Sequence, residues 1–155
     1  MKDKAYYETQ NIKNELKLRE ILSTLPPYCT QFFMSLEATT SSRTRLAYAY
    51  DLSVFFDYMH KNNPICAKME IRELPISILD QIRPVDIEEY IYHLRVYEKD
   101  GEAHTNEERG LKRKLSSLRT FYNYFFKNEM IDTNPACKVD MPKIHDKAIV
   151  RLDVD

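Results

Sequence analysis

The sequence predicts an all-α fold, a bundle of four main helices with an extra helical segment at the N-terminus. Apolar residues recur at the 3.6-residue period of a helix along several segments. Only two of the 155 residues are glycine, which disfavours tight hairpin turns and glycine-rich phosphate loops. Hydrophobic residues make up 43% of the chain, which is enough for a buried core. We therefore expect helices throughout and no strand.

Residues 1–25 are predicted to form a helical extension that precedes the main domain. Residues 5–22 are polar and favour a helix, which Pro26 and Pro27 then break. Because proline suits the start of a helix, a second helix is expected over residues 27–36. The apolar positions of the first helix are Ile12, Leu16, Leu18 and Leu22.

The main domain is predicted to span residues 26–143, with a long helix in its first half. Residues 39–42 are all Thr or Ser and supply candidate N-caps. The helix is expected to continue to about His60, before Asn62-Asn63-Pro64 ends it. Its apolar residues share one face, since they recur at i, i+4, i+7 and i+11. They are Tyr48, Leu52, Phe55 and Met59.

The middle of the chain is predicted to hold shorter elements. Residues 66–75 are expected to form a loop and residues 76–81 a short helix. Arg83-Pro84 then begins another helix, and acidic residues crowd its first turns, where the helix dipole is positive. The stretch from residue 98 to residue 104 is polar and contains Gly101, so a linker is expected there.

A second long helix is predicted in the C-terminal half. Thr105-Asn106-Glu107-Glu108 has the pattern of a capping box, so the helix is expected to start there and to reach about Asn128. Asn134-Pro135 is expected to cap and begin a short turn of helix. The apolar stripe of the long helix consists of Leu111, Leu115, Leu118, Tyr122 and Phe125.

Charge is strongly segregated along the chain. The formal net charge is −1, which taken alone argues mildly against a nucleic-acid partner. Between residues 109 and 151, however, ten Lys and Arg face only four Asp and Glu. A local basic face binds phosphate even when the total charge is near zero.

No self-contained active site is evident in the sequence. There is no nucleophile elbow, no phosphate-binding loop and no histidine pair at a metal-ligand spacing. Tyr48 and Tyr122 lie on apolar stripes and are interpreted as core aromatics. The three cysteines are far apart, so buried or half-buried free thiols are expected. They are Cys29, Cys66 and Cys137.

The most informative segment covers residues 109–120. With its leucines toward the core, a step of about 100° per residue turns six polar side chains to the other side. Arg and Lys neutralise phosphates, while Ser and Thr hydrogen-bond phosphate oxygens or base edges, so this side suits a DNA major groove. A solvated helix face is the alternative interpretation. The six residues are Arg109, Lys112, Arg113, Ser116, Arg119 and Thr120.

A second candidate DNA contact lies at the start of the earlier long helix. Free backbone N–H groups at a helix N-terminus already favour anions, and two cations and several hydroxyls gather there. A simple N-cap is the alternative interpretation. Two such sites in one domain favour a two-point grip on a duplex. The residues of this second site are Ser42, Arg43, Thr44 and Arg45.

Three motifs in this order resemble the N-terminal core-binding, SAM-like domain of tyrosine recombinases and phage integrases. The first is T-x3-Y-x2-DL-x2-F over residues 44–55, and the second is the helix start over residues 82–91. The last is the Arg-rich helix that ends in FYNY at residues 121–124, followed by NPA at residues 134–136 and PK at residues 142–143. Together they cover most of the chain.

The resemblance implies a bundle that clamps one face of double-stranded DNA, while a C-terminal catalytic domain grips the opposite face. It implies that residues 42–45 begin one DNA-facing helix, and that Arg113, Ser116 and Arg119 lie on the other. In a full-length protein it further implies attack by a tyrosine on DNA, and four protomers assembled on two duplexes. No metal or nucleotide cofactor is implied, because the covalent phosphotyrosine conserves the bond energy.

Residues 144–155 resemble the interdomain linker and the first residues of the catalytic domain. We therefore expect the catalytic residues to lie outside this chain, and this fragment not to be an enzyme. One departure from the family pattern concerns Arg109-Gly110, which occupies the place of a Ser or Thr. The last helix is therefore expected to start sooner or to bend at Gly110.

A cytoplasmic protein without a membrane partner is expected. No apolar run approaches the ~20 residues that span a bilayer, and charged residues rather than an apolar segment follow Met1. The rival hypothesis is a helical protein-interaction module with no nucleic-acid role. The charged N-terminal helix and the near-neutral net charge favour that alternative.

Overall fold

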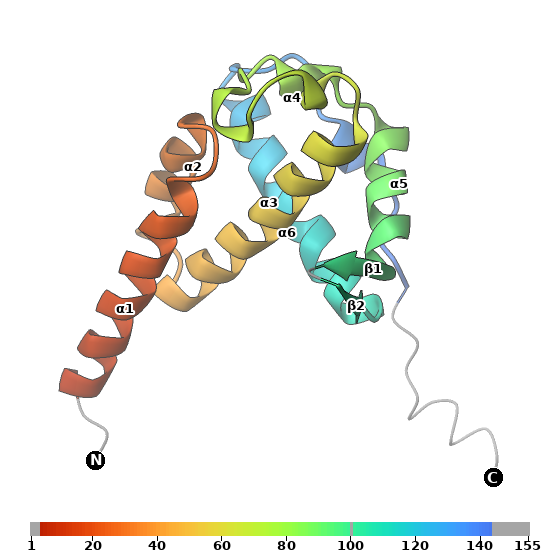
Figure 1. Ribbon diagram of the computed structural model, residues 1–155. Helices are drawn as coiled ribbons and strands as arrows, with labels where there is room; N and C mark the ends of the chain where they lie inside the picture. The colour runs from red at the N-terminus through yellow and green to blue at the C-terminus, as the bar shows by residue number, and fades with distance from the viewer. Residues whose placement is uncertain (1–3, 100, 144–155) are drawn as a thin grey trace, which may run out of the picture.

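The computed structural model describes residues 4–99 and 101–143, and these are mainly helical (Figure 1). Four helices form the bundle, which confirms the predicted all-α class. They are α2 (Tyr28–Leu36), α3 (Ser42–Asn62), α5 (Pro84–Leu94) and α6 (Glu108–Lys127). The segment 144–155, predicted to be a linker, lies outside the described residues.

The predicted N-terminal helix is α1 (Lys4–Leu22), which packs along α3. Its last turns are buried through Leu18, Ile21 and Leu22, whereas its first turns extend past the start of α3 (Figure 1). Two predicted apolar positions do not pack: Ile12 is 60% exposed and Leu16 is 61% exposed. Steps of 100° turn both side chains away from the side that carries Leu18.

Helix α3 begins where the run of Thr and Ser predicts. The Ser41 hydroxyl accepts a hydrogen bond from the Thr44 backbone N–H at 3.1 Å, which is a true N-cap. Leu52, Phe55 and Met59 are buried as predicted, and Tyr48 is half-buried. The helix therefore turns its apolar face inward.

The segment between α3 and α5 is more regular than the predicted loop. Two 3-10 turns, Cys66–Lys68 and Ile71–Glu73, precede a single α-helical turn, α4 (Ile78–Gln81). Helix α5 then starts at Pro84, where the Asp86 carboxylate accepts a hydrogen bond from the Arg83 backbone N–H at 2.8 Å. Asp86 in this first turn therefore caps the helix as well as complementing its dipole.

The predicted linker from residue 98 to residue 104 is wrong. Strands β1 (Val96–Lys99) and β2 (Glu102–Thr105) pair antiparallel there, in a register that sets Val96 opposite Thr105. Gly101 lies between them with a φ of +80°, a left-handed conformation that glycine adopts without strain. The Asp-Gly pair in the sequence is a hairpin-turn signal, which the linker prediction does not use.

The hairpin also removes the predicted capping box at the start of α6. Thr105 is the last residue of β2 and therefore extended, so α6 begins three residues later with Glu107 as N-cap and no side-chain cap. Asn106 instead donates to the Leu94 carbonyl at 2.7 Å. The helix passes through Gly110 and continues to Lys127.

The last predicted turn is a 3-10 helix, Pro135–Lys138. Its predicted cap is wrong, because the Asn134 side chain makes no capping hydrogen bond, and its buried Oδ1 has no partner in the described part of the chain. Burial of the apolar stripe of α6 confirms the prediction for that helix, and its Tyr122 hydroxyl donates to the Leu79 carbonyl at 3.0 Å. The core lies where α2, α3, α5 and α6 meet, which leaves the polar stripe of α6 outside.

Candidate nucleic-acid interface

The N-terminal halves of α3 and α6 both lie on the lower side of the molecule in Figure 1. A carboxylate joins them: Asp51 of α3 accepts hydrogen bonds from the Arg113 Nη2 at 2.8 Å and from the Ser117 hydroxyl at 2.7 Å. Thr44 lies seven residues before Asp51, two turns earlier on the same face of α3. The two predicted sites are therefore on one side of the molecule.

The outward stripe of α6 carries five of the six residues predicted for this helix. Arg109 and Lys112 are exposed, and 56% of the Arg113 side chain is exposed. Ser116 and Thr120 are half-buried, and the Thr120 hydroxyl donates to the Ser116 carbonyl at 3.0 Å. Cations are thus concentrated in the first two turns of the helix, beside α3.

The sixth residue, Arg119, has a different environment. Its Nε donates to the Ala136 carbonyl at 3.2 Å, and its Nη2 donates to the Val139 carbonyl. The Arg119 side chain therefore ties residues 136–139, which follow α6 in the chain, to α6. We do not include Arg119 among the proposed DNA contacts.

The predicted site at the start of α3 divides in the same way. Arg43 and Thr44 are exposed, whereas Ser42 is only 7% exposed. The Ser42 hydroxyl donates to Asn11 Oδ1 at 2.9 Å and accepts from Asn14 Nδ2 at 3.1 Å, so it joins α3 to α1. Ser42 is consequently a packing residue.

Arg45 also acts within the fold. Its side chain is 11% exposed, and its Nη1 donates to the carbonyls of Glu37 and Thr40. Its Nη2 lies 3.9 Å from a Glu15 carboxylate oxygen on α1. Arg43 and Thr44 therefore remain as the two outward residues of the second predicted site.

Sequence reasoning missed the role of Asp51. An acid on the apolar side of α3, one residue before Leu52, is the signal that could have found it, since buried acids are nearly always paired. It also missed Lys114, which is 9% exposed and donates to Asn106 Oδ1 at 3.0 Å. Burial lowers the pKa of Lys114, although Asp51 nearby opposes that effect. Lys114 is therefore turned away from the outward stripe.

Several groups with strongly raised pKa values are buried in the core. Burial raises the pKa of the Tyr90 and Tyr122 hydroxyls and of the Cys29 thiol well above their ordinary ranges, and that of Cys66 to about 11. Such groups stay protonated and are poor nucleophiles. Cys29 and Cys66 are buried as predicted, but Cys137 is exposed.

Within residues 4–99 and 101–143, no three metal-ligating side chains gather into a possible metal site. No helix in these ranges is long and apolar enough to cross a bilayer. What the outward side of α3 and α6 offers is a set of guanidinium, ammonium and hydroxyl donors. Such donors bind phosphate oxygens and base edges.

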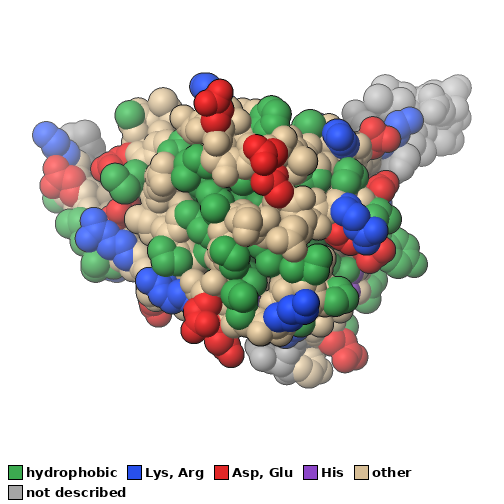
Figure 2. Space-filling view, turned by 90° about the horizontal axis from the view of Figure 1, so that it is seen from above, with side chains coloured by type: hydrophobic (Ala, Val, Ile, Leu, Met, Phe, Trp, Pro, Cys, Tyr) green, Lys and Arg blue, Asp and Glu red, His purple; other side chains and the backbone are tan. Residues whose placement is uncertain are grey.

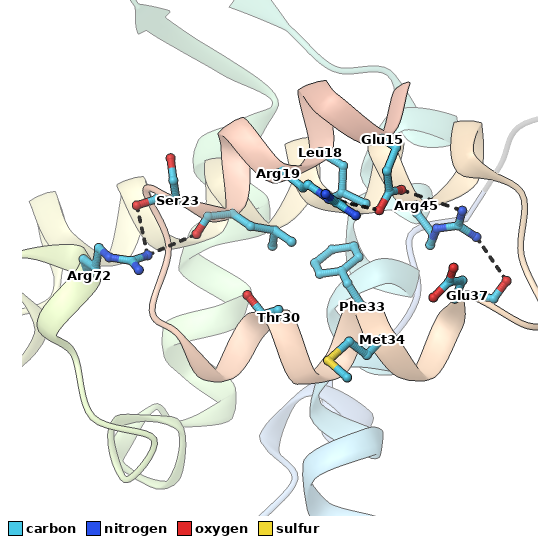
Figure 3. Close-up of a pocket in the computed structure, with 11 residues that line it drawn as sticks. Glu15, Leu18, Arg19, Ser23, Thr30, Phe33, Met34, Glu37, Arg45 and Arg72 are labelled. Carbon is cyan, nitrogen blue, oxygen red and sulfur yellow. Dashed lines mark hydrogen bonds and ion pairs between the residues drawn. The ribbon is translucent and has the colours of Figure 1, made fainter. Parts of the chain in front are cut away.

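The face seen from above has a different character. Figure 2 shows acidic and basic side chains interspersed there with hydrophobic and neutral ones. A separate pocket of about 460 Å³ lies between α1 and α2 (Figure 3). Arg72 closes one end of it by donating to the Ser23 carbonyl at 2.9 Å, and Arg45 and Glu15 lie at the other (Figure 3).

Fold and motifs together define the class of this protein, an all-α, SAM-like domain. Residues 30–129 match the family model described as phage integrase, N-terminal SAM-like domain. The chain belongs to this family. Helix α1 lies outside the matched residues.

Similar full-length proteins carry the name tyrosine recombinase XerC. The one from Leptospira interrogans (strain Fiocruz L1-130) is 33% identical over 112 residues, which are 72% of this chain and 30% of that protein. The one from Caldanaerobacter subterraneus is 31% identical over 138 residues, which are 85% of this chain and 38% of that protein. The chain thus spans about a third of their length. No solved structure gives a significant match.

Proposed function

We propose that this chain is the DNA-clamping domain of a site-specific tyrosine recombinase. One observation carries the proposal: the N-terminal halves of α3 and α6, which bear exposed cations, lie on one side of the bundle (Figure 1), and Asp51 of α3 pairs with Arg113 of α6 between them. Arg43 and Thr44 approach the duplex from α3, and the first turns of α6 approach it from beside them. The α6 contacts are Arg109, Lys112, Arg113, Ser116 and Thr120.

Phosphate contacts dominate the proposed binding. Four exposed cations neutralise phosphates and release counterions, which gives affinity with little dependence on sequence. Ser116 and Thr120 follow on the same stripe and are half-buried. In the proposed complex they face the edge of a DNA groove. Their hydroxyls supply the few base-directed hydrogen bonds of this domain.

In the complete protein the remaining two thirds carry the chemistry. A tyrosine of a C-terminal catalytic domain attacks a DNA phosphate and forms a 3′-phosphotyrosyl linkage, which needs no metal or nucleotide cofactor. Further protomers assemble with this one on the recombination-site DNA. The role of this domain is to hold the duplex against the catalytic domain, in the cytoplasm. We propose no catalytic activity for residues 1–155 alone.

Paired charge-removal variants test the proposal. Replacing Arg109 and Lys112 together by alanine removes two exposed cations from the outward stripe without touching a buried contact. Duplex affinity at about 0.15 M salt is expected to fall roughly ten-fold, because each lost phosphate contact removes counterion release. Lys68→Ala, an exposed lysine on the 3-10 turn after α3, is the matched control and is expected to change little.

A second candidate function is protein interaction, and the α1–α2 pocket favours it. Met34 is 70% exposed at its edge, and Ile12 and Leu16 are exposed on α1. Exposed apolar residues around a pocket are typical of partner-binding surfaces. If the surface around this pocket were the main functional surface, the charge-removal variants would leave the function of the protein unaffected, whereas Met34→Asp would abolish it.

A further inference from the structure

Asp51 is a buried carboxylate at the junction of the two proposed DNA-facing helices. It is 3% exposed, and both its oxygens accept hydrogen bonds from α6, at 2.8 Å from Arg113 and at 2.7 Å from Ser117. A buried charge is costly unless it is paired and hydrogen-bonded in this way. Asp51 therefore fixes the position of α6 residues relative to α3.

The guanidinium of Arg113, the partner of Asp51, is hydrogen-bonded at one edge and exposed at the other. A guanidinium carries five N–H donors, and among the described residues Asp51 is the one hydrogen-bond partner of the Arg113 guanidinium. More than half of the side chain is exposed, at 56%. The neighbouring Lys114 does not compete for Asp51, because its Nζ donates to Asn106 at 3.0 Å.

We propose that Asp51 is a positioning residue for DNA binding, which holds the Arg113 guanidinium with its open edge toward the duplex. This inference rests on the proposed function of the domain. Immobilising a long side chain on binding is costly, and doing so beforehand is worth about two- to twelve-fold in affinity per side chain. Asp51 supplies that order in the free protein.

Charge alone predicts the opposite effect, which makes the proposal easy to test. A carboxylate repels DNA phosphates, so its removal should tighten binding if electrostatics were the whole effect. At about 0.15 M salt, however, the Debye length is about 8 Å and that repulsion is screened. The orientation of Arg113 does not depend on salt. We therefore expect orientation to dominate under these conditions.

The experiment measures the affinity of Asp51→Asn for a random-sequence duplex at about 0.15 M salt. Asn keeps the shape and one acceptor but loses the charge that holds Arg113. Binding is expected to weaken about three-fold or more, and to weaken no further when Asp51→Asn is added to Arg113→Ala. Asp57→Asn is the matched control, an acid on α3 that pairs with Lys61 at 3.1 Å, and it should bind as tightly or more tightly.

Two further measurements separate positioning from folding. Ser117→Ala removes the other hydrogen bond of Asp51, so it should lower the melting temperature without the loss of DNA affinity. Without DNA, NMR relaxation of the Arg113 Nε–H should show an ordered side chain that becomes mobile in Asp51→Asn. An Asp51→Asn protein that binds as tightly as the unmutated chain, or keeps Arg113 equally ordered, overturns this role alone. Failure of the unmutated chain to bind duplex DNA refutes the proposed function and this role with it.

Discussion

Arginine side chains of one chain take three roles here, and the neighbours of each side chain decide which. Arg113 pairs at one edge and stays exposed, Arg119 donates to two carbonyls, and Arg45 lies against α1. Arg113 and Arg119 both satisfy the sequence pattern of a cation opposite the apolar stripe of α6, whereas Arg45 is predicted to bind DNA as a cation at the start of α3. Only the outward ones are available to a ligand.

Arg119→Ala is predicted to affect stability and to spare DNA binding. The substitution leaves the Ala136 and Val139 carbonyls without their charged donor, which costs roughly 1–3 kcal/mol in the free energy of unfolding. Urea denaturation should show this loss. Lys127→Ala, an exposed cation on the same helix, should leave the unfolding free energy nearly unchanged. A strong loss of duplex affinity in folded Arg119→Ala would contradict this assignment.

At the scale of the residue, the sequence predicts which way a side chain points better than which residues it contacts. Helical geometry correctly turns Arg109, Lys112 and Arg113 outward, because 3.6 residues per turn holds whatever the tertiary context. It could not predict that α1 would bury Ser42, or that the chain after α6 would return to Arg119. Those contacts are 28 residues apart in one case and 17 in the other.

Among the elements, α6 gives the bundle most of its centre. Leu111, Leu115, Phe121, Tyr122 and Phe125 are all 0% exposed. The same helix presents its cations on the opposite side, so the core and the proposed interface share one element. Substitutions in the buried stripe of α6 should therefore lower stability, and substitutions in its exposed stripe should lower DNA affinity.

Leu115→Ala is predicted to cost roughly 2–5 kcal/mol, since it removes three buried carbon atoms and leaves a cavity. Leu16→Ala makes the same change at a residue that is 61% exposed on α1, and should cost about 0.5 kcal/mol or less. Chemical denaturation of both variants checks the pair. Equal losses of unfolding free energy in the two variants would contradict the burial of Leu115 and the exposure of Leu16.

The start of α5 predicts a pH dependence. Burial alone would raise the pKa of Asp86, but hydrogen bonds from the Arg83 side chain and backbone outweigh it and hold the pKa below its ordinary value. A lowered pKa contributes stability that is present above the unfolded value, about 4, and is lost as pH falls through the folded value.

The unmutated chain should therefore be more stable than Asp86→Asn at neutral pH. The difference should begin to shrink as pH falls below about 4 and should vanish once the pH is below the folded pKa of Asp86. Thermal melts of both proteins across acid pH measure it. The other carboxylates titrate alike in both proteins and largely cancel. A difference that stays constant down to strongly acid pH would show that the charge of Asp86 is not what caps α5.

Elements with strong local signals were predictable, and those that depend on pairing were less so. Helix α3 followed from its Ser and Thr caps and its apolar period. The sequence predicts a linker in place of the β1–β2 hairpin, because the strands are only four residues long, too short for a clear alternation. Thr105 then looked like a cap, although strand pairing with Val96 holds it in an extended conformation.

At the scale of the molecule, charge arrangement matters more than net charge. The total is −1, and acids such as Glu107 and Glu108 lie at the start of α6 beside the proposed contacts. Long-range attraction to DNA is therefore weak, and affinity depends on the local set of cations. We expect the isolated chain to bind duplex DNA modestly and with a marked dependence on salt.

The affinity of the unmutated chain for a duplex across a series of salt concentrations tests the central claim most directly. Each neutralised phosphate contributes about −0.9 to the slope of log affinity against log salt, so the four exposed cations predict a total of about −3 to −4. They are Arg43, Arg109, Lys112 and Arg113. A slope near zero, or no binding even at low salt, would contradict the account.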